Sequence, residues 1–152
     1  MGLVHTEITL INAEDIFKVK NGLITNDEIR QTKVTAIVDT GAGTLVINEK
    51  LRLQLGLRIE GERQATLANN AKETVKIAES VRVCWKDRDT VCRPLVISDD
   101  GEILLGAIPL EDMDLIVDPA RQELTGAHGD EIVTMLLRLC RATAGSPCAS
   151  RN

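Results

Sequence analysis

Aromatic side chains are nearly absent from this chain. Its 152 residues include one Phe, one Trp and no Tyr, so aromatic residues make up only 1% of the sequence. The core must then be built from Val, Ile, Leu and Ala, and the chain offers few platforms on which nucleic-acid bases could stack. Because the net charge is −5, a phosphate-backbone partner is also disfavoured, and we expect no nucleic-acid ligand.

Long apolar runs and metal-ligand clusters are missing as well. No run of about eighteen apolar residues occurs, so we expect no spanning helix and no membrane partner. The histidines are only His5 and His128, and the four cysteines form no Cys-x-x-Cys pair, so we expect no metal site and no cofactor. The N-terminus has no basic region followed by an apolar signal core. We therefore expect a cytoplasmic protein with reduced thiols.

Short strand-like segments dominate the chain, which is long enough for one domain with a modest core. We expect a turn at residues 12–15, a helix over 49–55 capped by Asn48, and another short helix that begins near Pro109. Residues 131–139 fit a strand or a helix. Because there is no repeat and no alternation of strands with helices, the pattern favours a β-barrel or sandwich-like fold. Strands are expected at residues 3–11, 16–20, 29–33, 34–38, 45–47, 64–68, 73–78, 81–85, 90–97, 103–106, 115–118 and 122–125.

Two hairpins are expected in the middle of the chain. The first has its polar tip near residues 69–72, and the second joins residues 81–85 to residues 90–97. In the second hairpin Cys84 and Cys92 could become cross-strand neighbours. We expect two packed thiols there rather than a disulfide, because the expected compartment is reducing.

Residues 34–47 are the most informative stretch of the sequence. They predict a strand, a sharp polar turn and a second strand. Both strands are apolar on both faces, which is typical of buried strands. Asp39 lies where the first strand ends, and a carboxylate between buried strands needs hydrogen-bond donors. Thr40, Gly41 and Ala42 can supply a hydroxyl and backbone N–H groups, and Gly41 allows a tight turn. From these residues alone, Asp39 is either functional or a carboxylate that only caps its own turn.

Two motifs together resemble the retropepsin-like aspartic proteases, the single-lobed relatives of the retroviral type. Asp39-Thr40-Gly41 resembles the catalytic triplet, and Ala42 follows it as in retroviral enzymes. Leu104-Leu105-Gly106 resembles the apolar-apolar-Gly element that packs against the catalytic turn and precedes a short helix. Residues 106–119 are also similar to the end of small prokaryotic members. The chain departs from the family in Gly43 and in a flap without the glycine-rich stretch of viral enzymes.

The resemblance implies a mainly β, closed, barrel-like acid-protease fold with one or two short helices. It assigns residues 1–125 to a retropepsin-like protease domain. Residues 126–140 would form an apolar C-terminal segment, whose pattern fits either a dimer strand or a helix. Residues 141–152 are small, polar and proline-containing, and we expect them to be disordered.

The resemblance also implies an aspartic endopeptidase that needs no metal or cofactor. Because the chain has one such triplet and is too short for two lobes, it would act as a homodimer with one Asp39 from each copy. In the family, the hydroxyl at Thr40 bonds across the dimer and the N–H of Gly41 holds the carboxylate. The flap would close over an extended peptide substrate with residues Ala68, Asn69, Asn70, Ala71 and Lys72.

Two other interpretations remain open. The chain could be a dimeric peptide-binding or scaffolding module of the same fold with little or no turnover. It could also be a monomeric β-barrel in which the triplet occurs by chance. Asp112, Asp114 and Asp118 fit a solvated acidic helix end better than a metal cluster.

Overall fold

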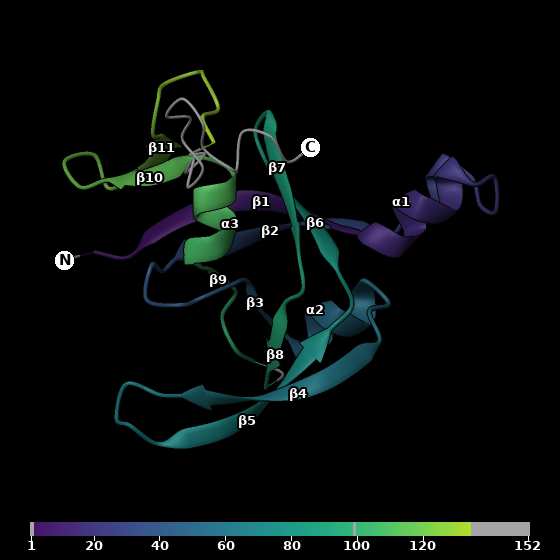
Figure 1. Ribbon diagram of the computed structural model, residues 1–152, viewed down its shortest axis with the longest axis horizontal. Helices are drawn as coiled ribbons and strands as arrows, with labels where there is room; N and C mark the ends of the chain where they lie inside the picture. The colour runs from purple at the N-terminus through teal and green to yellow at the C-terminus, as the bar shows by residue number, and fades with distance from the viewer. Residues whose placement is uncertain (1, 99, 135–152) are drawn as a thin grey trace, which may run out of the picture.

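A computed structural model of the protein describes residues 2–98 and 100–134 and is mainly β (Figure 1). Within these residues, nine strands form one strongly curled sheet, and two more form a separate ribbon. The strands are β1 (Val4–Asn12), β2 (Gln31–Val38), β3 (Val46–Asn48), β4 (Ile59–Thr66), β5 (Lys72–Ala78), β6 (Val81–Trp85), β7 (Arg88–Cys92), β8 (Leu95–Ile97), β9 (Leu104–Leu105), β10 (Leu115–Asp118) and β11 (Glu123–Gly126). The helices are α1 (Ala13–Lys20), a 3₁₀ turn η1 (Asn26–Glu28), α2 (Glu49–Gln54) and α3 (Ala107–Asp112).

The order of strands in the large sheet is β4-β5-β8-β3-β9-β2-β1-β6-β7. β4 and β7 are its two edges and do not pair with each other, so the described sheet is curled but open. The mainly β fold class predicted from the sequence is confirmed, with one correction: the barrel does not close.

The core is aliphatic, as the composition predicts. Ile8, Leu10, Leu45 and Leu105 are almost completely buried. At the end of β2 the neighbours Ala36 and Ile37 point to opposite faces and are both buried, which confirms a strand covered on both sides. The single Trp is also buried, and its indole N–H donates to Thr6 Oγ1 over 2.8 Å.

The short helices and the first hairpin follow their sequence signals. The side chain of Asn48 accepts from the backbone N–H of Leu51 over 2.8 Å and caps α2, as predicted. Gly56 follows this helix at φ +65°, in the left-handed region that favours glycine. β4 and β5 form the predicted hairpin, and α3 contains Pro109 in its first turn.

The prediction for residues 12–20 is wrong. In place of the expected turn and strand, the chain forms the helix α1 after Asn12, and this helix projects from the sheet (Figure 1). Asn12 caps this helix by accepting from the N–H of Asp15, and Glu14 forms an ion pair with Lys18 one turn later. Phe17 is 63% exposed, so the apolar residues that suggested a strand do not mark a buried face.

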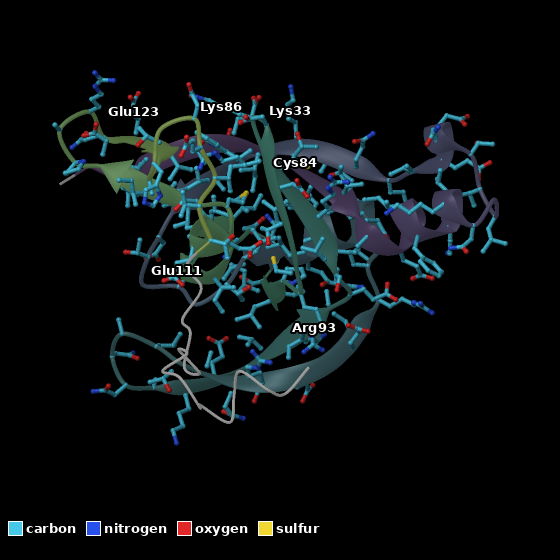
Figure 2. The ribbon with its side chains drawn as sticks, turned by 45° about the horizontal axis from the view of Figure 1, so that its top comes forward. Lys33, Cys84, Lys86, Arg93, Glu111 and Glu123 are labelled. Carbon is cyan, nitrogen blue, oxygen red and sulfur yellow. The ribbon has the colours of Figure 1, made fainter. Side chains whose placement is uncertain are left out.

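The predicted second hairpin also needs correction. The expected strand over residues 90–97 is divided at Pro94, so that β7 pairs with β6 while β8 pairs with β3 and β5. In the register observed, Cys84 is opposite Asp89 and Cys92 is opposite Val81. The two cysteines therefore point to opposite faces of the hairpin and are not neighbours, and both are free thiols (Figure 2 labels Cys84).

The described chain ends beside α3. β10 and β11 lie at the two strands expected over residues 115–118 and 122–125, and they pair with each other as a ribbon. The following loop contributes one isolated bridge, between His128 and Glu131. Residues 135–140 of the predicted apolar segment and all of the predicted disordered tail, residues 141–152, lie outside the described residues. No helix in the described part of the chain has the length and apolar character needed to cross a membrane.

Candidate active site

Asp39 lies immediately after β2, at the start of the loop that leads to β3. Its backbone N–H donates to the carbonyl of Leu105 over 3.0 Å, and its carbonyl accepts from Ala42 over 3.1 Å. Its side chain is half-buried, and Oδ1 accepts from the N–H of Gly41 over 2.9 Å. The carboxylate is thus held in one orientation by its own turn, which is what a charged group between buried strands requires.

β9 passes between the two strands that flank this turn. It pairs in parallel with β2, where Leu104 is opposite Ile37 and Leu105 is opposite Val38. It pairs antiparallel with β3, where Leu104 is opposite Val46. Because β2 and β3 are separated by β9, the chain between them must cross over the end of β9. The structure therefore brings together Asp39 and the apolar-apolar-Gly element, which are far apart in the sequence.

Gly106 makes the closest contact between these two segments. A Cβ atom there would lie 2.2 Å from the carbonyl oxygen of Thr44 and 2.7 Å from that of Ala42, closer than real Cβ atoms come. The next two N–H groups, of Ala107 and Ile108, donate to the carbonyls of Ala42 and Gly43 over 2.8 and 3.1 Å. The loop is therefore fixed by the absence of a side chain at Gly106 and by the first amides of α3.

Thr40 and Gly41 are exposed and Ala42 is half-buried. Their exposure leaves the outer side of the turn open to a ligand or to another protein chain. Within residues 2–98 and 100–134, no three His, Cys, Asp or Glu side chains gather where they could hold a metal ion.

The residues predicted for the flap form the tip of the β4–β5 hairpin and are exposed. The hydrogen bonds that shape this tip are its own: Leu67 and Ala71 pair across it, and Ala71 donates to the side chain of Asn69 over 3.0 Å. Asn70 has φ 64°, a conformation that Asn tolerates better than most residues. In Figure 1 this tip and the loop between β2 and β3 extend on the same side of the molecule, at the left.

Cys92 is a residue near the site that the sequence did not single out for it. Burial raises the pKa of its thiol, although the side chain of Thr44 and the backbone of Leu45 act in the opposite direction. The protonated thiol therefore packs against the far end of the Asp39 loop. No sequence signal could have placed it there, because its position depends on the register of β6 and β7.

Comparisons with known proteins give one family match and several structural similarities. A family described as aspartyl protease matches residues 25–137. The retroviral protease-like domain of Ddi1 from Leishmania major is similar at 16% identity and a TM-score of 0.49, over 82% of this chain and 88% of that one. A retropepsin-like aspartic protease from Rickettsia conorii is similar at 17% identity and a TM-score of 0.40, over 78% of this chain and 89% of that one. None of the curated proteins compared with the chain matches it.

The family match spans most of the chain and includes both segments that meet at the turn. It covers Asp39-Thr40-Gly41 and Leu104-Leu105-Gly106, the two motifs on which the resemblance was based. The chain belongs to the aspartyl protease family.

Proposed function

We propose that this protein is a homodimeric aspartic endopeptidase in which two copies of Asp39, one per subunit, activate a water molecule. The observation that carries the proposal is the Asp39 turn, which is held by Gly41 and crossed by β9 in a chain of the aspartyl protease family. One described chain supplies one such carboxylate. A second copy supplies the other if the exposed turns meet at a two-fold axis.

The reaction follows from the electrostatics of such a pair. Two carboxylates a few ångströms apart cannot both ionise easily, so they share one proton. The ionised Asp39 acts as general base on the water, and the protonated Asp39 of the other copy polarises the scissile carbonyl. The roles exchange when the amide nitrogen is protonated. No covalent intermediate is formed.

The neighbouring residues have separate roles in this proposal. The exposed hydroxyl of Thr40 bonds to the turn of the other copy, while the N–H of Gly41 keeps the carboxylate oriented. The hairpin tip, residues 68–72, covers an extended peptide substrate and pairs with its backbone. We also propose the cytoplasm as the compartment, as expected from the sequence, where Cys84 and Cys92 would stay reduced.

A second candidate is a dimeric peptide-binding or scaffolding module with little turnover. The flap tip favours this alternative, because its exposed residues include no aromatic side chain that would pack on a substrate. The same peptides would then bind but would not be cleaved.

The test is cleavage of a diverse peptide library, read by mass spectrometry from pH 4 to 7. Wild type should cleave, and Asp39→Asn should lower the rate by at least about a hundredfold, because a general acid or base contributes that much or more. A pepstatin-like transition-state mimic should inhibit the wild type. The matched control is Asp87→Asn, which neutralises an exposed carboxylate in the β6–β7 turn and should leave the rate unchanged.

Equal rates for wild type and Asp39→Asn would refute the proposed mechanism. Binding without cleavage by a protein shown to be dimeric would favour the binding module instead.

A further inference from the structure

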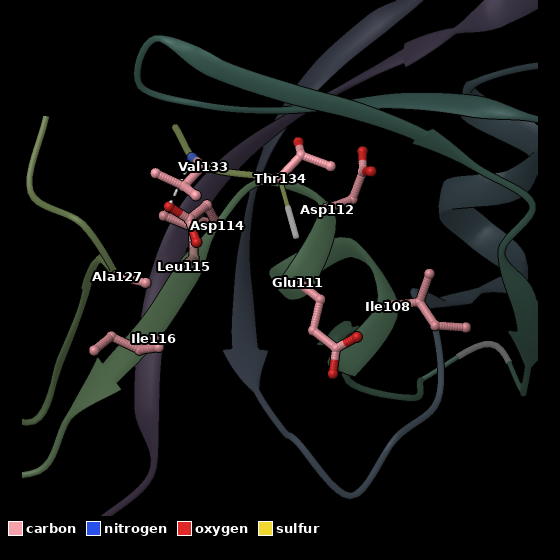
Figure 3. Close-up of a pocket in the computed structure, with 9 residues that line it drawn as sticks. All are labelled: Ile108, Glu111, Asp112, Asp114, Leu115, Ile116, Ala127, Val133 and Thr134. Carbon is pink, nitrogen blue, oxygen red and sulfur yellow. Dashed lines mark hydrogen bonds between the residues drawn. The ribbon is translucent and has the colours of Figure 1, made fainter. Parts of the chain in front are cut away.

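A hollow of about 490 Å³ lies between α3, β10 and the last described residues (Figure 3). We call it the α3–β10 hollow. Ile108, Glu111 and Asp112 contribute to it from α3, Ile116 from β10, and Val133 from the chain that follows the ribbon. A hollow of this volume is large enough for several side chains of a peptide.

The hollow is apolar on two sides and in contact with water. Ile108 is 60% exposed and Ile116 is 52% exposed, although both are branched apolar residues whose burial is favourable. Exposed apolar side chains that gather in one concave place often mark an interaction site. The hollow therefore favours an occupant with apolar side chains.

The charge in the hollow is negative. Glu111 extends outward from α3 (Figure 2), Asp112 is also exposed, and neither forms an ion pair with a described residue. Asp114 is different, because its carboxylate accepts from His128 Nδ1 over 2.7 Å and from the N–H of Val133 over 3.0 Å. Among the residues that the structure describes, these two carboxylates have no cationic partner, and they favour an occupant that carries lysine or arginine.

The α3–β10 hollow lies next to the Asp39 loop, and Ile108 connects the two. The N–H of Ile108 donates to the carbonyl of Gly43, and the side chain of the same residue forms one wall of the hollow. The loop that carries Asp39 is therefore in direct contact with the helix that lines the hollow. The position suits a secondary contact for a substrate already bound at the turn.

We propose that the α3–β10 hollow is a docking site for a segment of the protein substrate that combines apolar and basic residues and lies away from the scissile bond. The inference rests on the proposed peptidase function and names a class of substrate for it. Ile108 lies about one helical turn from Glu111 and Asp112, so apolar and acidic side chains share one side of the hollow. An extended segment contacts both kinds when its apolar and basic residues lie on the same face, at every second position. Its apolar side chains pack on Ile108 and Ile116, and its basic side chains reach Glu111 and Asp112.

The test measures binding in the full-length Asp39→Asn protein, which keeps the probe intact. The probe is a fluorescein-labelled peptide in which leucine and lysine take turns at every second position, with serine between them. Its binding is followed by fluorescence anisotropy at low and high salt. Two control peptides carry glutamate in place of lysine, or serine in place of leucine. Only the leucine–lysine peptide should bind well, and its affinity should fall as salt increases.

Two further variants test whether the hollow is the site. Glu111→Gln combined with Asp112→Asn should weaken binding about fivefold, because each exposed ion pair contributes modestly. Ile108→Ser should weaken it by a similar factor. The matched control neutralises two exposed carboxylates elsewhere, Glu28→Gln combined with Asp87→Asn, and should leave the affinity unchanged.

The proposal is overturned if the three peptides bind equally or if the hollow variants bind like the control variant. It is also overturned if sedimentation shows that the hollow variants weaken self-association instead, because the face would then contact a second copy. If wild type cleaves no peptide while probe binding still depends on the hollow, the peptidase function fails and the docking site remains.

Discussion

At the scale of single residues, Gly106 is the position where the smallest change should have the largest effect. Gly106→Ala places a methyl group within 2.2 Å of the Thr44 carbonyl, and backbone atoms on both sides leave it no room. We expect the free energy of unfolding to fall by about 1–3 kcal/mol, the usual cost of overpacking. Peptide cleavage should fall more than stability alone explains, because the Asp39 loop must shift. Thermal denaturation and cleavage rates measure the two effects.

Gly43→Ala is the matched control for this change. Gly43 lies in the same loop, but nothing is within 4 Å of the position its Cβ would occupy, and its φ is outside the left-handed region. The variant should keep the stability and activity of the wild type. If Gly106→Ala behaved like Gly43→Ala, the tight contact between the loop and β9 would not be needed for either property.

The sequence could reveal Asp39 and Gly106 because both lie in short motifs whose residue types have a local reason. Asp39 needs the N–H of the residue two positions later, and Gly106 must lack a side chain. Cys92 has no such local signal. Its place beside Thr44 depends on the pairing of β6 with β7 and on the turn of the chain at Pro94, which are long-range properties of the fold.

At the scale of elements, an ion pair between the buried carboxylate of Asp15 and the partly exposed Arg30 joins α1 to the start of β2. Asp15 is 2% exposed and accepts from the backbone N–H, Nε and Nη2 of Arg30 over 3.0, 2.9 and 2.9 Å. The hydrogen bond from the Arg30 guanidinium lowers the pKa of Asp15, and burial opposes this shift more weakly. The pair therefore ties α1 to the start of β2 most strongly when Asp15 is ionised.

The sign of the pH dependence follows from the lowered pKa. The stabilisation is fully present above the pKa of an unfolded Asp, about 3.9, and is lost as the pH falls through the lower pKa of the folded state. Asp15→Asn should lower the free energy of unfolding by about 2 kcal/mol at neutral pH. The difference from wild type should shrink below about pH 4, as measured by urea denaturation across pH.

Asp89→Asn is the control for this prediction. Its partner in the hairpin, Arg82, forms an ion pair with it in which both side chains are well exposed, so the change should cost less than about 1 kcal/mol. An equal loss for the two variants, or a difference for Asp15→Asn that does not shrink between pH 7 and pH 3, would contradict the assigned role of the Asp15–Arg30 pair.

The error at α1 shows what limits prediction at this scale. Ile16, Phe17 and Val19 suggested a short strand, yet the residues around them carried helix signals: Asn12 before two acidic residues, and lysines at the end. The Asn12 cap and the charges at the two helix ends therefore decide the structure of residues 13–20. In contrast, the short helix after Asn48 was predicted correctly, because cap, periodicity and Gly56 all agreed.

At the scale of the whole molecule, the sequence established the mainly β class but not how far the sheet closes. The order of strands places β4 and β7 at open edges, and such closure depends on many pairings that no single segment encodes. The assembly follows a similar logic. Thr40 and Gly41, next to Asp39, are exposed. In the proposed function, one Asp39 comes from this chain and the second comes from another copy.

The last prediction tests this division of the site between two copies. If each subunit supplies one Asp39, activity depends on the dimer concentration, and a tenfold dilution well below the dissociation constant should lower the rate about a hundredfold. Adding excess Asp39→Asn chains to wild type should inhibit it, because mixed dimers carry only one carboxylate. Chains with both Asp39→Asn and Gly106→Ala should inhibit less, since the distorted loop pairs poorly. A rate that falls only in proportion to dilution, with no inhibition by Asp39→Asn chains, would mean that one chain contains the complete site.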